Sequence, residues 1–82
     1  IEAVEGKPVQ FRCVVTGEPQ PDIKWLLDGE PIEDTKFERI IESDGTCILH
    51  IPETYPEDEG EYECVAINDF GTASTKADLY IQ

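Results

Sequence analysis

Hydrophobic and polar residues alternate along five short stretches of the chain, which is the pattern of half-buried β-strands. Side chains on a strand point to opposite faces in turn, so every second residue of such a stretch can face a core. No stretch carries the sustained stripe of an amphipathic helix. Many short strands at this spacing predict an all-β sandwich or barrel. The residues predicted to face inward are Val9, Phe11, Cys13 and Val15; Ile23, Trp25 and Leu27; Cys47, Leu49 and Ile51; Tyr62, Cys64 and Ala66; and Ala77, Leu79 and Ile81.

Turn-forming residues recur between these stretches. Asp44-Gly45 lies between two strand-like runs and predicts a β-hairpin, because glycine tolerates positive φ. Glu18-Pro19-Gln20-Pro21 is predicted to be an extended connector, since proline supplies no N–H to a strand ladder. At 82 residues, the chain is expected to form one domain, 1–82.

The strongly acidic charge balance bears on which kinds of partner the chain can bind. The net charge is −13, from 19 acidic and 6 basic residues. A protein that binds nucleic acid or an anionic membrane surface needs clustered lysine and arginine side chains. No run of apolar residues is long enough to span a bilayer. We therefore expect neither nucleic-acid nor membrane partners.

Carboxylates, a phenol and a thiol follow one another closely between residues 57 and 64, which raises the question of a chemical site. Tyr62 and Cys64 share the inward phase, whereas Glu61 and Glu63 point to the opposite face. These groups therefore cannot converge on one substrate.

Other candidate chemistry is equally sparse. His50 is the only histidine and is out of phase with the buried residues beside it, so we expect it on the solvent face. The three cysteines lack the close spacing of zinc ligands. The sequence predicts no enzyme, no metal site and no cofactor.

A more specific pattern is formed by Cys13, Trp25 and the segment Asp58-x-Gly60-x-Tyr62-x-Cys64. This pattern resembles the immunoglobulin fold, in its intermediate-set form. The resemblance runs from about Val4 to Ile81 and includes Leu49. It implies an immunoglobulin-like β-sandwich of two antiparallel sheets with Greek-key connections. The family usually has a longer first strand, so we expect that strand to be truncated here.

The resemblance also implies roles for the signature residues Cys13, Trp25, Leu49, Asp58, Gly60, Tyr62 and Cys64. In the family, two cysteines face each other across the sheets, and a tryptophan packs against them. A tyrosine turns its hydroxyl back to a corner, formed here by Asp58 and Gly60. An aspartate at the position of Asp58 often pairs with a basic residue, for which Arg39 is the candidate.

The resemblance makes Cys13 and Cys64 the candidate disulfide pair, and the phase of Cys47 predicts a third buried sulfur. In an oxidising compartment the pair would be bonded, and in a reducing one all three would be thiols. A spare thiol invites disulfide exchange, and the chain has no Asn-x-Ser/Thr sequon. Both points favour a cytoplasmic location over an extracellular one.

A candidate partner face follows from the outward phase of three of the predicted strands, those around Trp25, Cys64 and Leu79. Its residues are Lys24, Leu26, Val65, Ile67 and Tyr80, with Phe70 at a turn. Contiguous exposed apolar residues often mark a partner site. The alternatives are that neighbouring long side chains cover the strip and that Phe70 packs under its own hairpin.

The closest resemblance is to domains of titin, twitchin, obscurin, myosin-binding and palladin-like proteins, carried by the segment "IPETYPEDEGEYECVAIND". It implies a non-catalytic, monomeric spacer and docking module of a large sarcomeric or cytoskeletal chain, which could carry a kinase domain elsewhere. Its partners would be other proteins and adjacent immunoglobulin or fibronectin-type domains. Force on the two termini would then load antiparallel strands in shear. The alternative is an extracellular domain of an adhesion molecule or receptor that binds a protein ligand.

Overall fold

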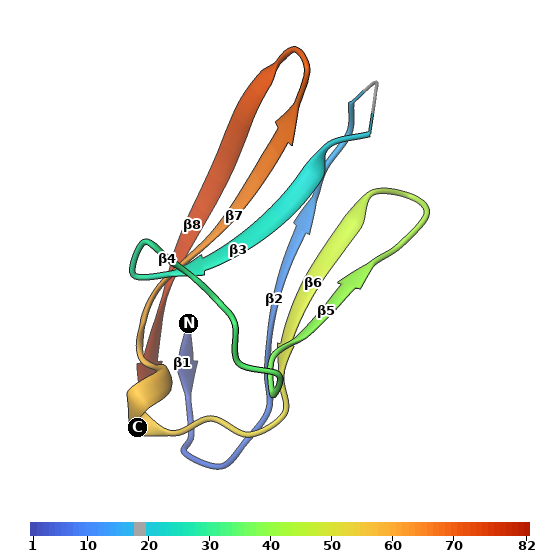
Figure 1. Ribbon diagram of the computed structural model, residues 1–82. Coiled ribbons are helices and arrows are strands. Elements are labelled where there is room, and N and C mark those ends of the chain that lie inside the picture. Colours follow the sequence, from blue (N-terminus) through green and yellow to red (C-terminus); the bar gives the residue numbers. More distant parts are fainter. Residues whose placement is uncertain (18–19) are drawn as a thin grey trace.

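The chain folds into two layers of β-strands, as the ribbon of the computed structural model shows (Figure 1). The structure describes residues 1–17 and 20–82, so Glu18 and Pro19 of the expected connector lie outside the described residues. The elements are β1 (Glu2–Ala3), β2 (Val9–Val14), β3 (Asp22–Leu27), β4 (Glu30–Pro31), β5 (Glu38–Ile41), β6 (Thr46–Ile51), η1 (Pro56–Asp58), β7 (Gly60–Asn68) and β8 (Gly71–Ile81). Within the described ranges, no helix is long and apolar enough to cross a membrane.

The larger sheet has the strand order β1-β8-β7-β3-β4, and the smaller sheet has the order β2-β6-β5. The chain crosses between the layers from β1 to β2, from β2 to β3, from β4 to β5 and from β6 to β7, so residues distant in sequence meet in the interior. The prediction of an all-β sandwich is confirmed.

One strand pair departs from the expected antiparallel pattern. β1 pairs with β8 in parallel, with Glu2 opposite Tyr80 and Ala3 opposite Ile81, whereas the other described pairs are antiparallel. These two strands come from opposite ends of the chain. No tight turn joins them, so nothing forces them to run in opposite directions. The terminal strands are therefore not the antiparallel pair that the sequence suggested.

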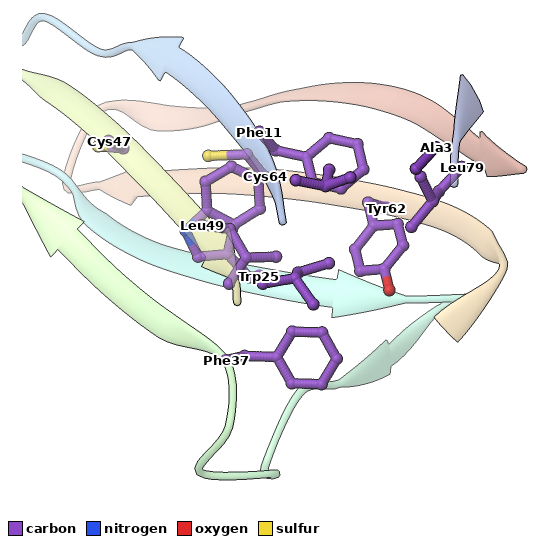
Figure 2. Close-up of a cluster of buried hydrophobic side chains, with 11 residues drawn as sticks. Ala3, Phe11, Trp25, Phe37, Cys47, Leu49, Tyr62, Cys64 and Leu79 are labelled. Atoms are coloured by element: carbon purple, nitrogen blue, oxygen red, sulfur yellow. The ribbon is translucent and has the colours of Figure 1, made fainter. Parts of the chain in front are cut away.

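The core lies between the two sheets, where side chains of both layers meet (Figure 2). Phe11 of β2 stacks on Tyr62 of β7 with ring centroids 4.5 Å apart. Leu49 and Ile51 have no exposed surface. The core residues are Ala3, Val9, Phe11, Trp25, Phe37, Cys47, Leu49, Ile51, Tyr62, Cys64 and Leu79.

β6 is buried on both faces, which its alternating pattern did not predict. Ile48, expected on the solvent face, is only 6% exposed. β6 is the middle strand of its sheet, with Arg12 on one side of Ile48 and Ile40 on the other. Directly opposite residues share a face and lie close together. The neighbouring side chains therefore shield Ile48 from water.

The Asp44-Gly45 turn joins β5 to β6 as predicted. Gly45 has φ +94°, and its N–H donates to the carbonyl of Glu42. The Asp44 carboxylate accepts a bond from the N–H of Thr46. A side chain at position 45 would place its Cβ 2.2 Å from the carbonyl oxygen of Val15, so only glycine fits.

Candidate functional site

The predicted site residues occupy three regions, which are a buried corner beside η1, the interior between the sheets, and the outer face of the larger sheet. At the corner, the hydroxyl of Tyr62 donates to the carbonyl of Asp58 over 2.7 Å. The Asp58 carboxylate accepts a 2.9 Å bond from the N–H of Tyr55. Tyr62 is 1% exposed and Asp58 4% exposed. Burial, with the Asp58 charge nearby, raises the pKa of the Tyr62 phenol well above its usual range. These bonds fix the chain where it passes from the smaller sheet into β7.

The basic partner of Asp58 is Lys36, and the prediction of Arg39 was wrong. Lys36 Nζ lies 2.8 Å from the Asp58 carboxylate. Arg39 instead donates to the carbonyls of Ile32 and Phe37. Arg39 lies three residues further along the chain, about 10 Å in an extended strand. The loop before β5 therefore brings Lys36 to the corner. Sequence reasoning missed Lys36 because it lies outside the strand pattern.

Gly60 begins β7 in a conformation that suits glycine, with φ +150°. A Cβ there would lie 2.7 Å from both carboxylate oxygens of Asp28. The same carboxylate accepts a bond from the N–H of Glu61. Gly60 thus lets β7 start close beside the turn after β3.

The three cysteines lie close together in the interior. The sulfurs of Cys13 and Cys64 are 2.9 Å apart, and Cys47 is opposite Cys13 on the neighbouring strand. All three are free thiols in the structure. Trp25 is opposite Cys64 on β3 and is 7% exposed. Burial raises the pKa of the Cys47 and Cys64 thiols, so both favour the neutral form. The arrangement is that of packing groups, since a reactive cysteine needs a lowered pKa.

The predicted partner face is divided rather than continuous. Lys24 is opposite Val65, and Leu26 is opposite Glu63. Leu26 and Val65 are half-buried, whereas Ile67 and Tyr80 are exposed.

Tyr80 lies at the far end of β8 from the rest of this face. The paired rows Glu63–Lys76 and Glu61–Asp78 separate it from Val65. Tyr80 therefore does not join the strip made by the other residues.

Phe70 lies at the tip of the β7–β8 hairpin and is 83% exposed. It does not pack under its own hairpin. It borders a shallow hollow with Val15, Pro21 and Thr72. Among the described residues, no group of three or more histidine, cysteine or carboxylate side chains is placed to hold a metal.

A two-layer sandwich with a tryptophan, two facing sulfurs and a tyrosine-tied corner at its centre defines an immunoglobulin-like domain. The family model "Immunoglobulin I-set domain" matches residues 1–81. The chain belongs to the immunoglobulin I-set family.

The relatives include very long proteins. The chain is 49% identical over 74 residues to the titin homolog of Caenorhabditis elegans, covering 90% of this chain and 0% of that protein to the nearest per cent. It is 44% identical over 79 residues to nexilin of Mus musculus, covering 96% of this chain and 13% of nexilin. The chain thus spans only a small part of these relatives.

Solved structures of titin domains are also similar. The titin M3 domain superimposes with a TM-score of 0.94 at 39% identity, over 99% of this chain and 85% of that one. The titin Z1Z2 domains, solved in complex with telethonin, give 0.94 at 28% identity, over 100% and 43%. One chain of the complex between titin M10 and an obscurin-like 1 immunoglobulin domain gives 0.93 at 27%, over 99% and 83%. The chain is an immunoglobulin domain of the kind found in titin-like muscle proteins.

Proposed function

We propose that the chain is a non-catalytic module of a large multidomain sarcomeric or cytoskeletal protein, where it acts as a mechanical spacer and a docking unit. The observation that carries the proposal is 49% identity to a titin homolog across 90% of the chain. The small share of each relative that the chain spans fits one unit in a longer array. In this proposal residues 1–82 form one domain with a shortened first strand, β1.

The pairing of the terminal strands supports the spacer role. Tyr80 N–H donates to the Ile1 carbonyl over 2.9 Å, and Gln82 N–H donates to the Ala3 carbonyl over 2.7 Å. β1 and β8 run parallel, so tension between the N-terminus and the C-terminus pulls them past each other. Hydrogen bonds loaded in this way must break together, which resists extension more than breaking them one at a time.

The docking role is supported by the two titin complexes described above, with telethonin and with an obscurin-like 1 domain. By analogy, this domain is proposed to bind protein partners and adjacent immunoglobulin or fibronectin-type domains of its own chain, and to be monomeric by itself. Its charge of −13 favours partners with basic surfaces. The outer face with Lys24, Leu26, Val65 and Ile67 stays a candidate contact region.

A non-catalytic role is consistent with the corner and the sulfur cluster. Tyr62 and Asp58 are committed to bonds that hold the fold, and the raised thiol pKa values suit packing rather than nucleophilic attack.

The alternative is an extracellular domain that binds a protein ligand. It is favoured by one observation, the 2.9 Å approach of the Cys13 and Cys64 sulfurs, which suits oxidation in a secretory compartment.

Antibodies against the chain test the two locations in cells that express the parent protein. We expect staining of filaments inside permeabilised cells and no staining of intact cells. Staining of the surface of intact cells would overturn the cytoplasmic proposal and support the extracellular alternative.

A further inference from the structure

A shallow groove lies between the loop that follows β4 and the corner beside η1. Its volume is about 310 Å³, and its floor is formed by the apolar residues Leu27, Pro31, Ile32 and Phe37. β4, which contributes Pro31, is the edge strand on the opposite side of the larger sheet from β1. Figure 1 shows the loop crossing here from β4 to β5 in the smaller sheet. Apolar surface rimmed by polar residues often marks a site of protein–protein contact.

The floor of the groove connects the molecular surface with the core. Pro31 is exposed, and Leu27 and Ile32 are half-buried. Phe37 is 6% exposed, and Figure 2 shows its ring pointing from the loop towards the core cluster. An apolar side chain that enters the groove would therefore pack on Ile32 and Phe37.

The protein's own hydrogen bonds hold the walls of the groove in place. The N–H of Ile32 donates to the carbonyl of Trp25 over 3.1 Å. The carboxylate of Asp34 accepts a 3.0 Å bond from the N–H of Lys36. The ion pair between Lys36 and Asp58 joins the loop to the opposite wall. A preformed groove favours binding, because little conformational freedom is lost when it is filled.

The rim of the groove is acidic on both walls. Glu30, Glu33 and Asp34 lie on the wall formed by β4 and the loop, and Glu57 lies on the wall formed by η1. Five of the nine described lining residues carry carboxylates, and none of the nine is basic. Among the described residues, Glu30, Glu33 and Glu57 take part in no ion pair. Negative charge therefore remains available to a partner on both sides of the apolar floor.

Two cations close to the groove are already engaged. Arg39 donates to the carbonyls of Ile32 and Phe37, and Lys36 pairs with Asp58. Lys36 also shows how this corner holds a cation, because its ammonium group meets a carboxylate while lying over aromatic rings. A partner's arginine can use the same combination, since its stem covers apolar surface while its guanidinium group stays at the rim.

Charge and shape together select the occupant. The acidic rim repels anionic ligands, and a second copy of the chain would bring another −13 charge to the contact. The apolar floor and acidic walls instead suit a segment in which basic residues flank an apolar one. The apolar side chain enters the groove, and the basic side chains reach the carboxylates of the two walls. Opposite charge across such a contact also disfavours acidic partners.

We propose that the groove between residues 30–34 and η1 binds a segment of a protein partner in which arginine or lysine residues flank an apolar residue. The apolar residue packs on Ile32 and Phe37, and the flanking cations pair with Glu33 on one wall and Glu57 on the other. This inference rests on the proposed docking role and assigns that role to a surface other than the outer face of the larger sheet.

The test uses the 82-residue chain and a capped peptide with the core arginine-leucine-arginine between glycine and serine residues. NMR follows the backbone amides during titration, and nuclear Overhauser effects locate the bound leucine. We expect shifts of the amides of Ile32, Glu33 and Glu57, and contacts from the leucine methyl groups to the side chains of Ile32 and Phe37. No shift at peptide concentrations up to about 1 mM would overturn the proposal.

Two further peptides separate entry into the groove from simple attraction of charges. Replacing the leucine with serine removes the group that packs on the floor and should weaken binding about tenfold or more. Replacing both arginines with glutamate should abolish binding. Equal binding of the leucine and serine peptides would mean that only charge is recognised, and would overturn the proposal.

Three variants with the same charge change locate the site. Glu33→Arg and Glu57→Arg each alter one wall, and each should weaken binding about tenfold or more. Glu42→Arg is the matched control in the turn between β5 and β6, and it should weaken binding less than about threefold, because distant exposed charges are screened. All three replace exposed side chains, and the amide spectrum of each variant checks that the fold is kept. Equal weakening by all three would contradict binding between the two walls.

Two other outcomes would also overturn the proposal. Concentration-dependent shifts of the Ile32 and Glu57 amides without peptide would mean that a second copy occupies the groove. Loss of peptide binding in a longer piece of the parent protein would mean that the parent's own chain fills it. These results are independent of where the antibodies stain cells, so failure here leaves the proposed cellular role standing.

Discussion

The ammonium group of Lys36 lies 2.8 Å from the carboxylate of Asp58, and this pair joins the loop before β5 to the corner before β7. The Asp58 side chain is 5% exposed and that of Lys36 is 29% exposed. Lys36 also lies 5.5 Å from the ring centroid of Phe37 and 5.2 Å from that of Tyr55. The cation thus neutralises a buried carboxylate and is itself held between two rings.

Replacing Lys36 with methionine should destabilise the chain by about 2–4 kcal/mol. The substitution keeps an apolar stem but leaves a buried carboxylate without its charge partner, which is strongly unfavourable. Lys76→Met is the matched control, because Lys76 forms an exposed pair with Glu61 at 3.6 Å. The control should change stability by less than about 1 kcal/mol. Urea unfolding measures both, and equal losses would contradict the importance of the Lys36–Asp58 pair.

Gly45→Ala should destabilise the chain more than Gly29→Ala. Both glycines have positive φ, +94° and +83°. An alanine at either position suffers the left-handed backbone penalty of about 1–2 kcal/mol. At position 45 the Cβ also meets the Val15 carbonyl at 2.2 Å, whereas nothing lies within 4 Å of a Cβ at position 29. Denaturant titration should show a lower unfolding midpoint for Gly45→Ala than for Gly29→Ala. Equal midpoints would contradict the clash of a Cβ at position 45 with the Val15 carbonyl.

Stability should fall as the pH rises above about 10, in part because of Tyr62. Burial raises the pKa of its phenol in the folded chain, and a tyrosine in the unfolded chain ionises near pH 10. The stability that the neutral Tyr62 phenol provides is therefore complete below about pH 10. Above that pH it is lost at about 1.4 kcal/mol per pH unit. Tyr62→Phe should lower stability by about 1–3 kcal/mol at neutral pH, because the bond to Asp58 is lost.

The same variant should also flatten the decline at high pH. Unfolding free energies measured between pH 8 and pH 11, roughly the range in which thiols and phenols ionise, would reveal the change in slope. A slope identical to that of the unsubstituted chain would show that Tyr62 does not cause the decline.

The reduced chain should contain three titratable thiols after denaturation, and mild oxidation should leave one. The sulfurs of Cys13 and Cys64 are adjacent, and 51 positions separate these residues in sequence. A disulfide closing a loop of that size stabilises a fold by about 4 kcal/mol on the chain-entropy interpretation. Cys47→Ala should leave no free thiol after oxidation, while Cys13→Ser should prevent the stabilisation. Thiol counting and thermal unfolding measure both, and three thiols remaining after oxidation would contradict the pairing.

Strand phase and fold could be predicted from the sequence because the buried faces repeat with a period of two. The alternation around Leu49 and Tyr62 predicted their burial correctly. The same rule failed at Ile48, since burial of a central strand on both faces depends on which strands flank it. Flanking strands are a property of topology rather than of local pattern.

The less predictable features all depend on how separated segments meet. Lys36 reaches Asp58 through an irregular loop, which no periodicity describes. The division of the predicted partner face could not be predicted without the strand register, which places charged pairs between Val65 and Tyr80.

We propose above that this domain bears force along the chain through the β1–β8 pair. Two proline substitutions on the same edge of β8 test it. Tyr80→Pro removes the N–H that bonds to Ile1, and Ser74→Pro removes one on the same side of β8 that no described strand pairs with.

The deciding measurement is the unfolding force of single molecules pulled by their two termini. We expect Tyr80→Pro to unfold at a clearly lower force than the unsubstituted chain, and Ser74→Pro to unfold at nearly the same force. Equal forces for Tyr80→Pro and the unsubstituted chain would show that the terminal strand pair does not carry the load, and would contradict the spacer mechanism.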